Sequence, residues 1–529
     1  MTRDSVAIGL DLGTSSLKAV AVTPDGTVLA RFTAGYPTDR PGPGAAEQRP
    51  ADWMTALETA VTAIAATVPP SRWSAIGLSA MIPTLVPADA DGNPAGAAIT
   101  WEDGRAEDQG TRLRDAIGGD DLYARTGQWV DGRYLLPVTA RLREIGDRRG
   151  FAPWLLGAKD WLFGRLTGEF ATDPSTATGF GCYDLATGSW DMTVAAGALS
   201  PGVLPSLPPV LPSTHAAPML PSMARRLGIP AGIPVVLGAA DSVLAARGLG
   251  VTSPGDAAYV AGTSTVIMGI APGFVADPAH RYLVTPLEHP GPVGLEMDLV
   301  ATGSSVRWLA GLLGLGQDGE ATAWQLAASV APGADGVVLL PYLGPGEQGA
   351  LWDPTLRGTL IGATLAHGRE HLARALLDGI VLESRRCLAV LEEVSGIRGA
   401  IVMTGPSIRS REVVVSLAEA TGRTVRWPAD PDHPASAWGA AALAFEAVGM
   451  PVPAGPVLAP GITPAPGTRA VWDALWERHE DVRIAVGGLP APLAAPGVPA
   501  APLAAAGLPS AAAPRPSAPT NRADGGTTA

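Results

Sequence analysis

The residues near the start of the chain are of the types that bind phosphate. Residues 6–23 hold an apolar run that reaches Asp11, a turn of small and hydroxyl residues at 13–16, and a second apolar run that carries Lys18. Free backbone N–H groups in such a turn can surround phosphate oxygens, and Gly13 lets the backbone approach them closely. Asp11, at the tip of its predicted strand, is placed to hold a hydrated cation beside those phosphates. An ordinary β-hairpin is the alternative interpretation.

A second stretch repeats this order near the middle of the chain. Residues 256–270 again run from a predicted strand through a Gly262-Thr263-Ser264 turn into another strand. Two copies about half a chain apart predict a duplicated fold whose halves face each other across a nucleotide. The recurrence favours phosphate binding over two coincidental hairpins.

Asp241 stands where a predicted strand at 234–238 meets an Ala-rich helix. A carboxylate at such a junction either caps the helix or acts in the cleft between the two halves. It lies 15 residues before position 256, where the second phosphate-binding stretch begins. This place favours a general base, which accepts the proton of an attacking alcohol.

The elements that position these residues follow from the periodicity of apolar side chains. We expect helices over 51–67, 369–395, 436–449 and 471–484, and a further helix that ends at Gly168. Short strands are expected over 75–79, 84–88 and 337–343, and residues 400–407 are expected to form a strand that enters a turn. Cys387 falls on the apolar positions of the longest helix, so it is expected in the core. Ser436 is the expected N-cap of its helix. Beyond about residue 487 the chain is rich in Ala, Pro, Gly and Ser without a period, which predicts disorder.

Composition limits the classes of function. The 529 residues are 47% hydrophobic and carry a net charge of −13, which predicts large globular domains and argues against a nucleic-acid partner. Cys182 and Cys387 are the only cysteines, and no apolar run reaches membrane-spanning length. We therefore expect a cytoplasmic protein with no membrane partner. Only Lys18 and Lys159 are lysines among 37 basic residues, which draws attention to the ammonium of Lys18 beside a phosphate turn.

Taken in order, these motifs resemble the FGGY family of carbohydrate kinases, in the actin, Hsp70 and sugar-kinase superfamily, over most of residues 6–485. The resemblance implies an α/β fold of two actin-like (ribonuclease H-like) domains around a cleft, with duplicated β-sheet cores and flanking helices. It implies domains at 1–249 and 250–486, followed by the tail at 487–529. It also implies ATP and Mg²⁺ as cofactors, Asp241 as the catalytic base and Asp11 near the metal. The nucleotide-binding residues that it implies are Gly13, Thr14, Ser15, Lys18, Gly262, Thr263, Ser264, Gly303, Gly405 and Ser407.

The segment at 101–105 resembles the sugar-pocket motif of that family. The resemblance implies a substrate site made of Met81, Ile82, Trp101, Asp103, Arg105, Asp241 and Ser242. A salt-bridge cluster beside a packed tryptophan is the alternative for the motif itself. Some positions depart from the usual pattern, because Ile82-Pro83 offers a sugar no polar group and Pro406-Ser407 replaces small residues in the adenosine-side turn. Ser242 also follows the acid where an amide is common.

The expected activity is ATP-dependent phosphorylation of a sugar or polyol hydroxyl. The first candidate substrate is a ketopentose such as D-xylulose. Gluconate is the alternative: an arginine that contacts a carboxylate would favour it, whereas Asp103 accepting hydroxyls would favour xylulose. A catalytically weak sugar-binding or regulatory protein on the same fold is a further alternative, suggested by Pro406-Ser407. The expected partner is a small-molecule sugar or polyol, and a homodimer is a compatible assembly.

Overall fold

The computed structural model describes residues 5–199, 204–344, 349–353 and 356–487. The disordered tail predicted over 487–529 lies outside these residues, except for Gly487, the last residue of helix α15 (Arg469–Gly487). No described helix combines the length and the apolar character needed to cross a membrane.

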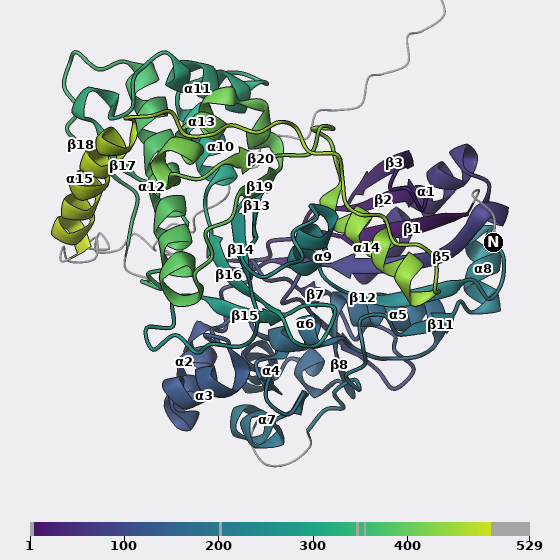
Figure 1. Ribbon diagram of the computed structural model, residues 1–529. Coiled ribbons are helices and arrows are strands. Elements are labelled where there is room, and N and C mark those ends of the chain that lie inside the picture. The colour runs from purple at the N-terminus through teal and green to yellow at the C-terminus, as the bar shows by residue number, and fades with distance from the viewer. Residues whose placement is uncertain (1–4, 200–203, 345–348, 354–355, 488–529) are drawn as a thin grey trace, which may run out of the picture. The chain divides into compact units, whose positions relative to one another are not determined.

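Two six-stranded sheets organise the described residues (Figure 1). The N-terminal sheet has the strand order β11 (Ala216–Pro218), β12 (Pro234–Ala240), β5 (Trp73–Ala80), β1 (Val6–Leu12), β2 (Ser16–Val22) and β3 (Val28–Gly35). The C-terminal sheet has the order β15 (Leu283–Pro286), β16 (Val293–Leu299), β14 (Thr265–Ala271), β13 (Ala257–Ala261), β19 (Ile401–Thr404) and β20 (Val425–Arg426).

The two sheets share one plan. In the N-terminal sheet the hairpin β1–β2 pairs antiparallel, with β3 beside β2 and the parallel strand β5 beside β1. In the C-terminal sheet the hairpin β13–β14 pairs in the same way, with β16 beside β14 and the parallel strand β19 beside β13. The duplicated α/β fold predicted from the two turns is confirmed.

Amphipathic helices cover the sheets and bury their apolar faces. On the N-terminal sheet these include α1 (Pro50–Thr67), α5 (Ala158–Thr167), α8 (Pro221–Leu227) and α9 (Asp241–Gly248). The C-terminal half adds α10 (Gly303–Leu312), α11 (Gly319–Ala328), α12 (Arg369–Ser395), α13 (Arg411–Thr421), and the short pair β17 (Val338–Leu340) and β18 (Thr359–Ile361). Cys387 of α12 is fully buried in the core around the C-terminal sheet, as predicted.

A smaller layer is inserted into the N-terminal half. It contains a four-stranded sheet of β4 (Glu47–Gln48), β7 (Ala98–Ile99), β6 (Leu85–Ala88) and β8 (Trp154–Gly157). Beside it lie α2 (Glu107–Ile117), α3 (Gly119–Thr126), α4 (Leu135–Glu144), α6 (Pro174–Ala177), α7 (Met192–Leu199), and the hairpin β9 (Tyr183–Asp184) and β10 (Ser189–Trp190). These helices have an apolar core of their own, which includes Leu113, Leu136 and Phe180.

Helix α14 (Ala435–Ala447) comes late in the chain but packs on the N-terminal sheet and against α9 (Figure 1). Glycines make this close approach possible, because a Cβ on Gly9 or Gly77 would lie 1.7 or 2.0 Å from carbonyl oxygens of α14. The core around α14 also takes in Met268 and Ile270 of the C-terminal sheet. The prediction of Ser436 as N-cap is wrong, because the cap position is Pro434 and Ser436 lies inside the first turn.

Candidate active site

One cavity of about 160 Å³ is lined by both predicted phosphate turns and by Asp241. Thr14 comes from the first turn, Ser264 from the second and Asp241 from the start of α9. The other polar residues of this central cavity are Gln128, Arg133, Tyr134, Thr178, Ser242, Thr285, Glu296, Asp298 and Ser436. The structure therefore places the two turns and Asp241 around the same cavity.

Asp241 is the first residue of α9, directly after β12. The cap position is Ala240, so the alternative in which Asp241 is the N-cap does not describe this helix. Its Oδ1 accepts a hydrogen bond from the backbone N–H of Ser242 at 2.9 Å. Burial and the nearby charge of Asp11 raise the pKa of Asp241 to about 7. A carboxylate with such a pKa is well suited to accept a proton near neutral pH.

Asp11 lies at the end of β1, opposite Lys18 in the β1–β2 register. The side chain is 3% exposed, its Oδ1 accepts a hydrogen bond from Ser79 at 2.9 Å, and its Oδ2 lies 3.8 Å from the Lys18 ammonium. Mg²⁺ in phosphate-transfer sites is usually held by one or two carboxylates, waters and the substrate phosphates. Among the residues that the structure describes, no three His, Cys, Asp or Glu side chains gather as a metal site. Asp11 is a single carboxylate of the kind that could hold Mg²⁺ together with waters and substrate phosphates.

The first turn is held open by its neighbours. The N–H of Gly13 donates to the carbonyl of Ser16 at 3.1 Å, and Tyr36 donates its hydroxyl hydrogen to the carbonyl of Gly13. Gln48 donates to the carbonyl of Thr14 at 2.7 Å. Ser15, at the tip of the turn, is exposed. These contacts fix the backbone of the turn and leave Ser15 as its exposed residue.

The second turn packs against two further predicted nucleotide-binding glycines. A Cβ on Gly303 would lie 2.3 Å from the carbonyl oxygen of Gly262, and Ser304 N donates to the Thr263 carbonyl at 3.0 Å. A Cβ on Gly405, where φ is +105°, would lie 1.9 Å from the carbonyl oxygen of Ala261. Gly303 and Gly405 therefore let their backbone approach the backbone at Ala261 and Gly262 closely. Ser407 follows in the short 3₁₀ helix Pro406–Arg409.

The predicted sugar contacts divide into two groups. Met81, Ile82, Trp101 and Ser242 line the central cavity, and Trp101 donates its indole N–H to Thr14 Oγ1 at 2.9 Å. Asp103 and Arg105 do not line it. The guanidinium of Arg105 instead contacts Asp103 and Glu47, each at 2.6 Å, and Asp103 also accepts from Ala46 N at 2.9 Å. For these two residues the structure matches the salt-bridge alternative.

Several lining residues were missed by the sequence analysis. Glu296 and Asp298 alternate along β16, so both face the cavity, and Arg133 and Tyr134 precede α4. Two acidic residues two positions apart in an otherwise apolar strand were the available signal. Tyr134 donates to Gln128 at 2.8 Å. No local pattern distinguishes Gln128 or Tyr134 from ordinary polar residues near a helix.

The carboxyls of β16 are electrostatically unusual. Glu296 is 8% exposed, and both of its hydrogen bonds go to Oε2, from Ser242 at 3.1 Å and Thr285 at 2.9 Å. Burial and the charge of Asp298 raise the pKa of Glu296 to about 8. Burial also raises the pKa of Asp298, although Arg133 opposes the shift. The buried Oδ1 of Asp298 has no hydrogen-bond partner among the described residues.

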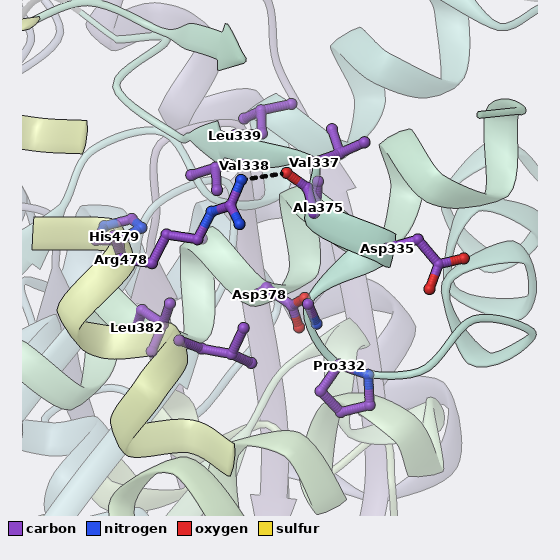
Figure 2. A pocket seen from close by; sticks show the side chains of 14 residues that line it. Pro332, Asp335, Val337, Val338, Leu339, Ala375, Asp378, Leu382, Arg478 and His479 are labelled. Carbon is purple, nitrogen blue, oxygen red and sulfur yellow. Dashed lines mark hydrogen bonds between the residues drawn. The ribbon is translucent and has the colours of Figure 1, made fainter. Parts of the chain in front are cut away.

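A second cavity, of about 260 Å³, lies in the C-terminal half between α12, α15 and β17 (Figure 2). We call it the C-terminal cavity. Asp378 accepts hydrogen bonds from Gly333 N and Arg374 Nε, both at 2.8 Å, and Arg478 donates to the Gly336 carbonyl at 2.7 Å. His479 pairs with Glu383 at 2.7 Å. These polar groups already have protein partners, and none of the predicted site residues lies there.

Comparison with known proteins gives a consistent result. Residues 6–248 match the model of the FGGY family of carbohydrate kinases, N-terminal domain, and residues 257–448 match that of its C-terminal domain. Gluconokinase of Bacillus subtilis is 30% identical over 77% of this chain and 81% of the relative. Xylulose kinase of Escherichia coli is 30% identical over 83% and 89%. The crystal structure of xylulose kinase from Rhodospirillum rubrum, 30% identical, superposes with a TM-score of 0.80 over 90% of this chain and 98% of that one.

Duplicated sheets, paired turns and an acid at a shared cavity define an actin-like, two-domain phosphotransferase fold. The chain belongs to the FGGY family of carbohydrate kinases. It is therefore a carbohydrate kinase, and kinases of this family use ATP to phosphorylate small sugar-like substrates.

Proposed function

We propose that this kinase transfers the γ-phosphoryl group of ATP to a hydroxyl of a ketopentose, with D-xylulose as the first candidate. The observation that carries the proposal is the central cavity, which Thr14, Ser264 and Asp241 line together. This arrangement would place a base and two phosphate-binding turns around one acceptor hydroxyl. We include a cytoplasmic location in the proposal, because ATP is the donor and no disulfide joins Cys182 and Cys387.

In the proposed reaction, Asp241 accepts the proton of the sugar hydroxyl as its oxygen attacks the γ-phosphorus. A sugar hydroxyl is a poor nucleophile, so a carboxylate within hydrogen-bond reach lowers the barrier. The phosphoryl group needs charge stabilisation and in-line positioning more than covalent chemistry. N–H and hydroxyl groups of the first turn, at Gly13, Thr14 and Ser15, and of the second turn would supply those donors.

The nucleotide and its metal would lie along the two turns. Asp11 would hold Mg²⁺, through water or directly, and the metal would neutralise charge on the phosphates. Lys18, whose ammonium is half exposed beside Asp11, would add a positive charge there. The close-packed backbone at Gly262, Gly303 and Gly405 would leave a smooth surface for nucleotide, with Ser407 at its edge. Pro406 adds bulk to this edge and would affect nucleotide affinity.

Neutral hydroxyl-rich substrates suit the lining of the cavity. Gln128, Tyr134, Ser242, Thr285 and the carboxyls of β16 offer acceptors and donors, while Met81, Ile82 and Trp101 offer apolar contact. Relatives named xylulose kinase support the same choice.

Gluconate is the second candidate, and Arg133 is the observation that favours it. This guanidinium lines the cavity and could pair with a substrate carboxylate, and a relative of similar identity is named gluconokinase. However, Arg133 is already paired with Asp131, whose carboxylate contacts Nε and Nη2 at 2.8–3.0 Å.

The test is ATP turnover by the purified chain against D-xylulose, other pentuloses, pentitols and gluconate, with mass spectrometry of the product. We expect sugar-dependent ADP release and a mono-phosphorylated ketopentose. Binding of sugar without turnover would instead support the regulatory alternative. Turnover of gluconate alone would replace the first candidate with the second.

A further inference from the structure

Two carboxyls of the central cavity have no part in the proposed proton transfer. Glu296 and Asp298 reach the cavity from one face of β16, and Glu296 accepts a hydrogen bond from Ser242, the residue after Asp241. Glu296 is more than nine-tenths buried, and its hydrogen bonds from Ser242 and Thr285 both go to Oε2. The buried Oδ1 of Asp298 has no partner among the described residues. A buried acceptor is normally satisfied, so this oxygen points to a missing donor beside Glu296.

Acidic groups outnumber basic ones among the described residues around this space. Asp241, Glu296 and Asp298 are three carboxyls that line the cavity, whereas Arg133 is the one arginine that lines it. The guanidinium of Arg133 is already held by Asp131 through contacts at both Nε and Nη2. Lys18 lies nearer to Asp11, on the side of the first turn. A substrate that brought its own carboxylate would therefore meet three acidic groups and one cation that is already paired.

We propose that Glu296 and Asp298, the acidic pair, are specificity-determining residues that select an uncharged polyhydroxylated substrate and reject sugar acids. The inference rests on the proposed kinase function and deepens it by naming the substrate class. Substrate hydroxyls would donate to Oε1 of Glu296 and Oδ1 of Asp298 and so supply the missing donors. A carboxylate has no such hydrogen to donate and would add a like charge.

The magnitude is sufficient to decide between the two candidate substrates. At an effective dielectric constant of about 20, like charges about 6 Å apart repel strongly enough to produce discrimination on the order of 100-fold. A carboxylate placed beside the acidic pair would also leave its buried acceptors unpaired, because it has no hydrogen to donate. Because burial and the charge of Asp298 raise the pKa of Glu296 to about 8, repulsion of a carboxylate by Glu296 is full only above that pH, and the ratios are therefore measured at pH 8.5.

The experiment compares D-xylulose with gluconate in the wild type, in Glu296→Gln, in Asp298→Asn and in the double variant. Two ratios are measured for each protein, each being the value for D-xylulose divided by the value for gluconate. The first ratio is of kcat/KM, and the second is of association constants from calorimetry without ATP. Both amides keep the shape of the side chain and remove its charge. We expect wild-type ratios of about 100 or more. In the double variant both ratios should fall at least tenfold, because kcat/KM and the association constant for gluconate rise.

Asp378→Asn is the matched control, because Asp378 is a buried carboxylate of the C-terminal cavity with a raised pKa, outside the proposed site. Its ratios should equal those of the wild type. Circular dichroism and thermal unfolding identify any variant that has not folded, and the single variants then supply the comparison.

The possible outcomes test the specificity role of the acidic pair and the proposed kinase reaction separately. A wild type that prefers gluconate, or a double variant with unchanged ratios, overturns the role of the acidic pair while the kinase function stands. If Arg133→Gln then removes gluconate binding, the second candidate substrate holds. Absence of turnover with every compound overturns the proposed reaction, whereas the ratio of association constants still decides the acidic pair.

Discussion

Two buried glutamates, Glu296 in the central cavity and Glu383 beside the C-terminal cavity, have pKa values shifted in opposite directions. Glu383 is paired with His479, which lines the C-terminal cavity, and with Arg386. Although burial alone would raise it, these partners lower the pKa of Glu383 to about 2. In the central cavity, burial and a neighbouring carboxyl raise the pKa of Glu296 to about 8. The protein therefore stabilises Glu383 as the anion and Glu296 as the neutral acid.

This difference is the one expected if the central cavity serves a ligand. A structural site satisfies its polar groups within the protein, as the bond from Arg478 to Gly336 illustrates (Figure 2). A site for chemistry keeps acceptors unsatisfied and pKa values displaced, because the substrate completes it. The C-terminal cavity, at about 260 Å³ against about 160 Å³, is not the smaller of the two, so volume would not select the central cavity.

The largest expected contrast comes from removing one carboxylate in each cavity. Asp241→Asn should lower kcat by about 10²- to 10⁴-fold, because the sugar hydroxyl loses its proton acceptor. Sugar binding measured by calorimetry should remain. Asp378→Asn should leave kcat within about twofold, whatever it does to stability. Near-normal turnover by Asp241→Asn, measured as ADP release at saturating substrates, would remove the mechanism.

The pH dependence of the reaction tests the same contrast without a mutation. Asp241 must be ionised to accept a proton, and its pKa is raised to about 7. The value of kcat/KM should therefore rise with pH and level off above about 7.5. At pH 6 it should be about tenfold below the plateau. A profile that is flat from pH 5.5 to 9, or that falls with rising pH, would contradict this role.

Replacing one buried glutamate of each region by glutamine should change Tm in opposite directions. The folded pKa of Glu296, about 8, exceeds the ordinary 4.5, so its contribution to stability is full below about pH 4.5 and is lost as pH rises to about 8. Glu296→Gln does not titrate and should raise Tm at pH 8.5 by about 2–4 °C, with a smaller gain at pH 5.

Glu383→Gln is the counterpart in the other region. The folded pKa of Glu383, about 2, is below 4.5, so its contribution is present above about pH 4.5 and is lost as pH falls toward 2. This variant should lower Tm by about 2–4 °C or more at neutral pH. Scanning calorimetry of the two variants across pH measures both effects, and shifts of the same sign would remove the electrostatic distinction.

The smallest effect is expected at the rim of the C-terminal cavity. Arg478→Ala removes one hydrogen bond to the Gly336 carbonyl from an exposed side chain. The free energy of unfolding should fall by about 0.5–1.5 kcal/mol, and KM and kcat should not change. Urea unfolding and steady-state kinetics measure the two quantities. A change in KM for either substrate would show that this cavity communicates with the reaction.

Much of the fold was predictable because its signals are local. The turns at 13–16 and 262–264 each join two strands of the same sheet, so residues close in sequence reveal the hairpin. Helix α12 was predicted with the bounds 369–395, since its apolar period and the stop at Gly396 lie within one segment. The place of Asp241 follows equally from a strand, β12, that leads directly into a helix.

The rest of the site depends on partners that are distant in the sequence. Arg105 pairs with Glu47, which also pairs with Arg149. Because these partners lie outside residues 101–105, the motif alone could not predict the ion pairs. Glu296 reaches the cavity only because β16 pairs with β14 and so faces α9. Pairing between strands that far apart is set by tertiary packing, which a single sequence does not display.

The return of α14 to the N-terminal sheet has a consequence for how the protein is made. Gly9 and Gly77 of that sheet are shaped to receive the backbone of α14, a segment synthesised more than 350 residues later. The first half emerging from the ribosome therefore exposes an apolar face until residues 435–447 arrive to cover it. A gene cut between the two halves would encode a first fragment with a permanently uncovered sheet, so the natural unit of expression is the undivided chain.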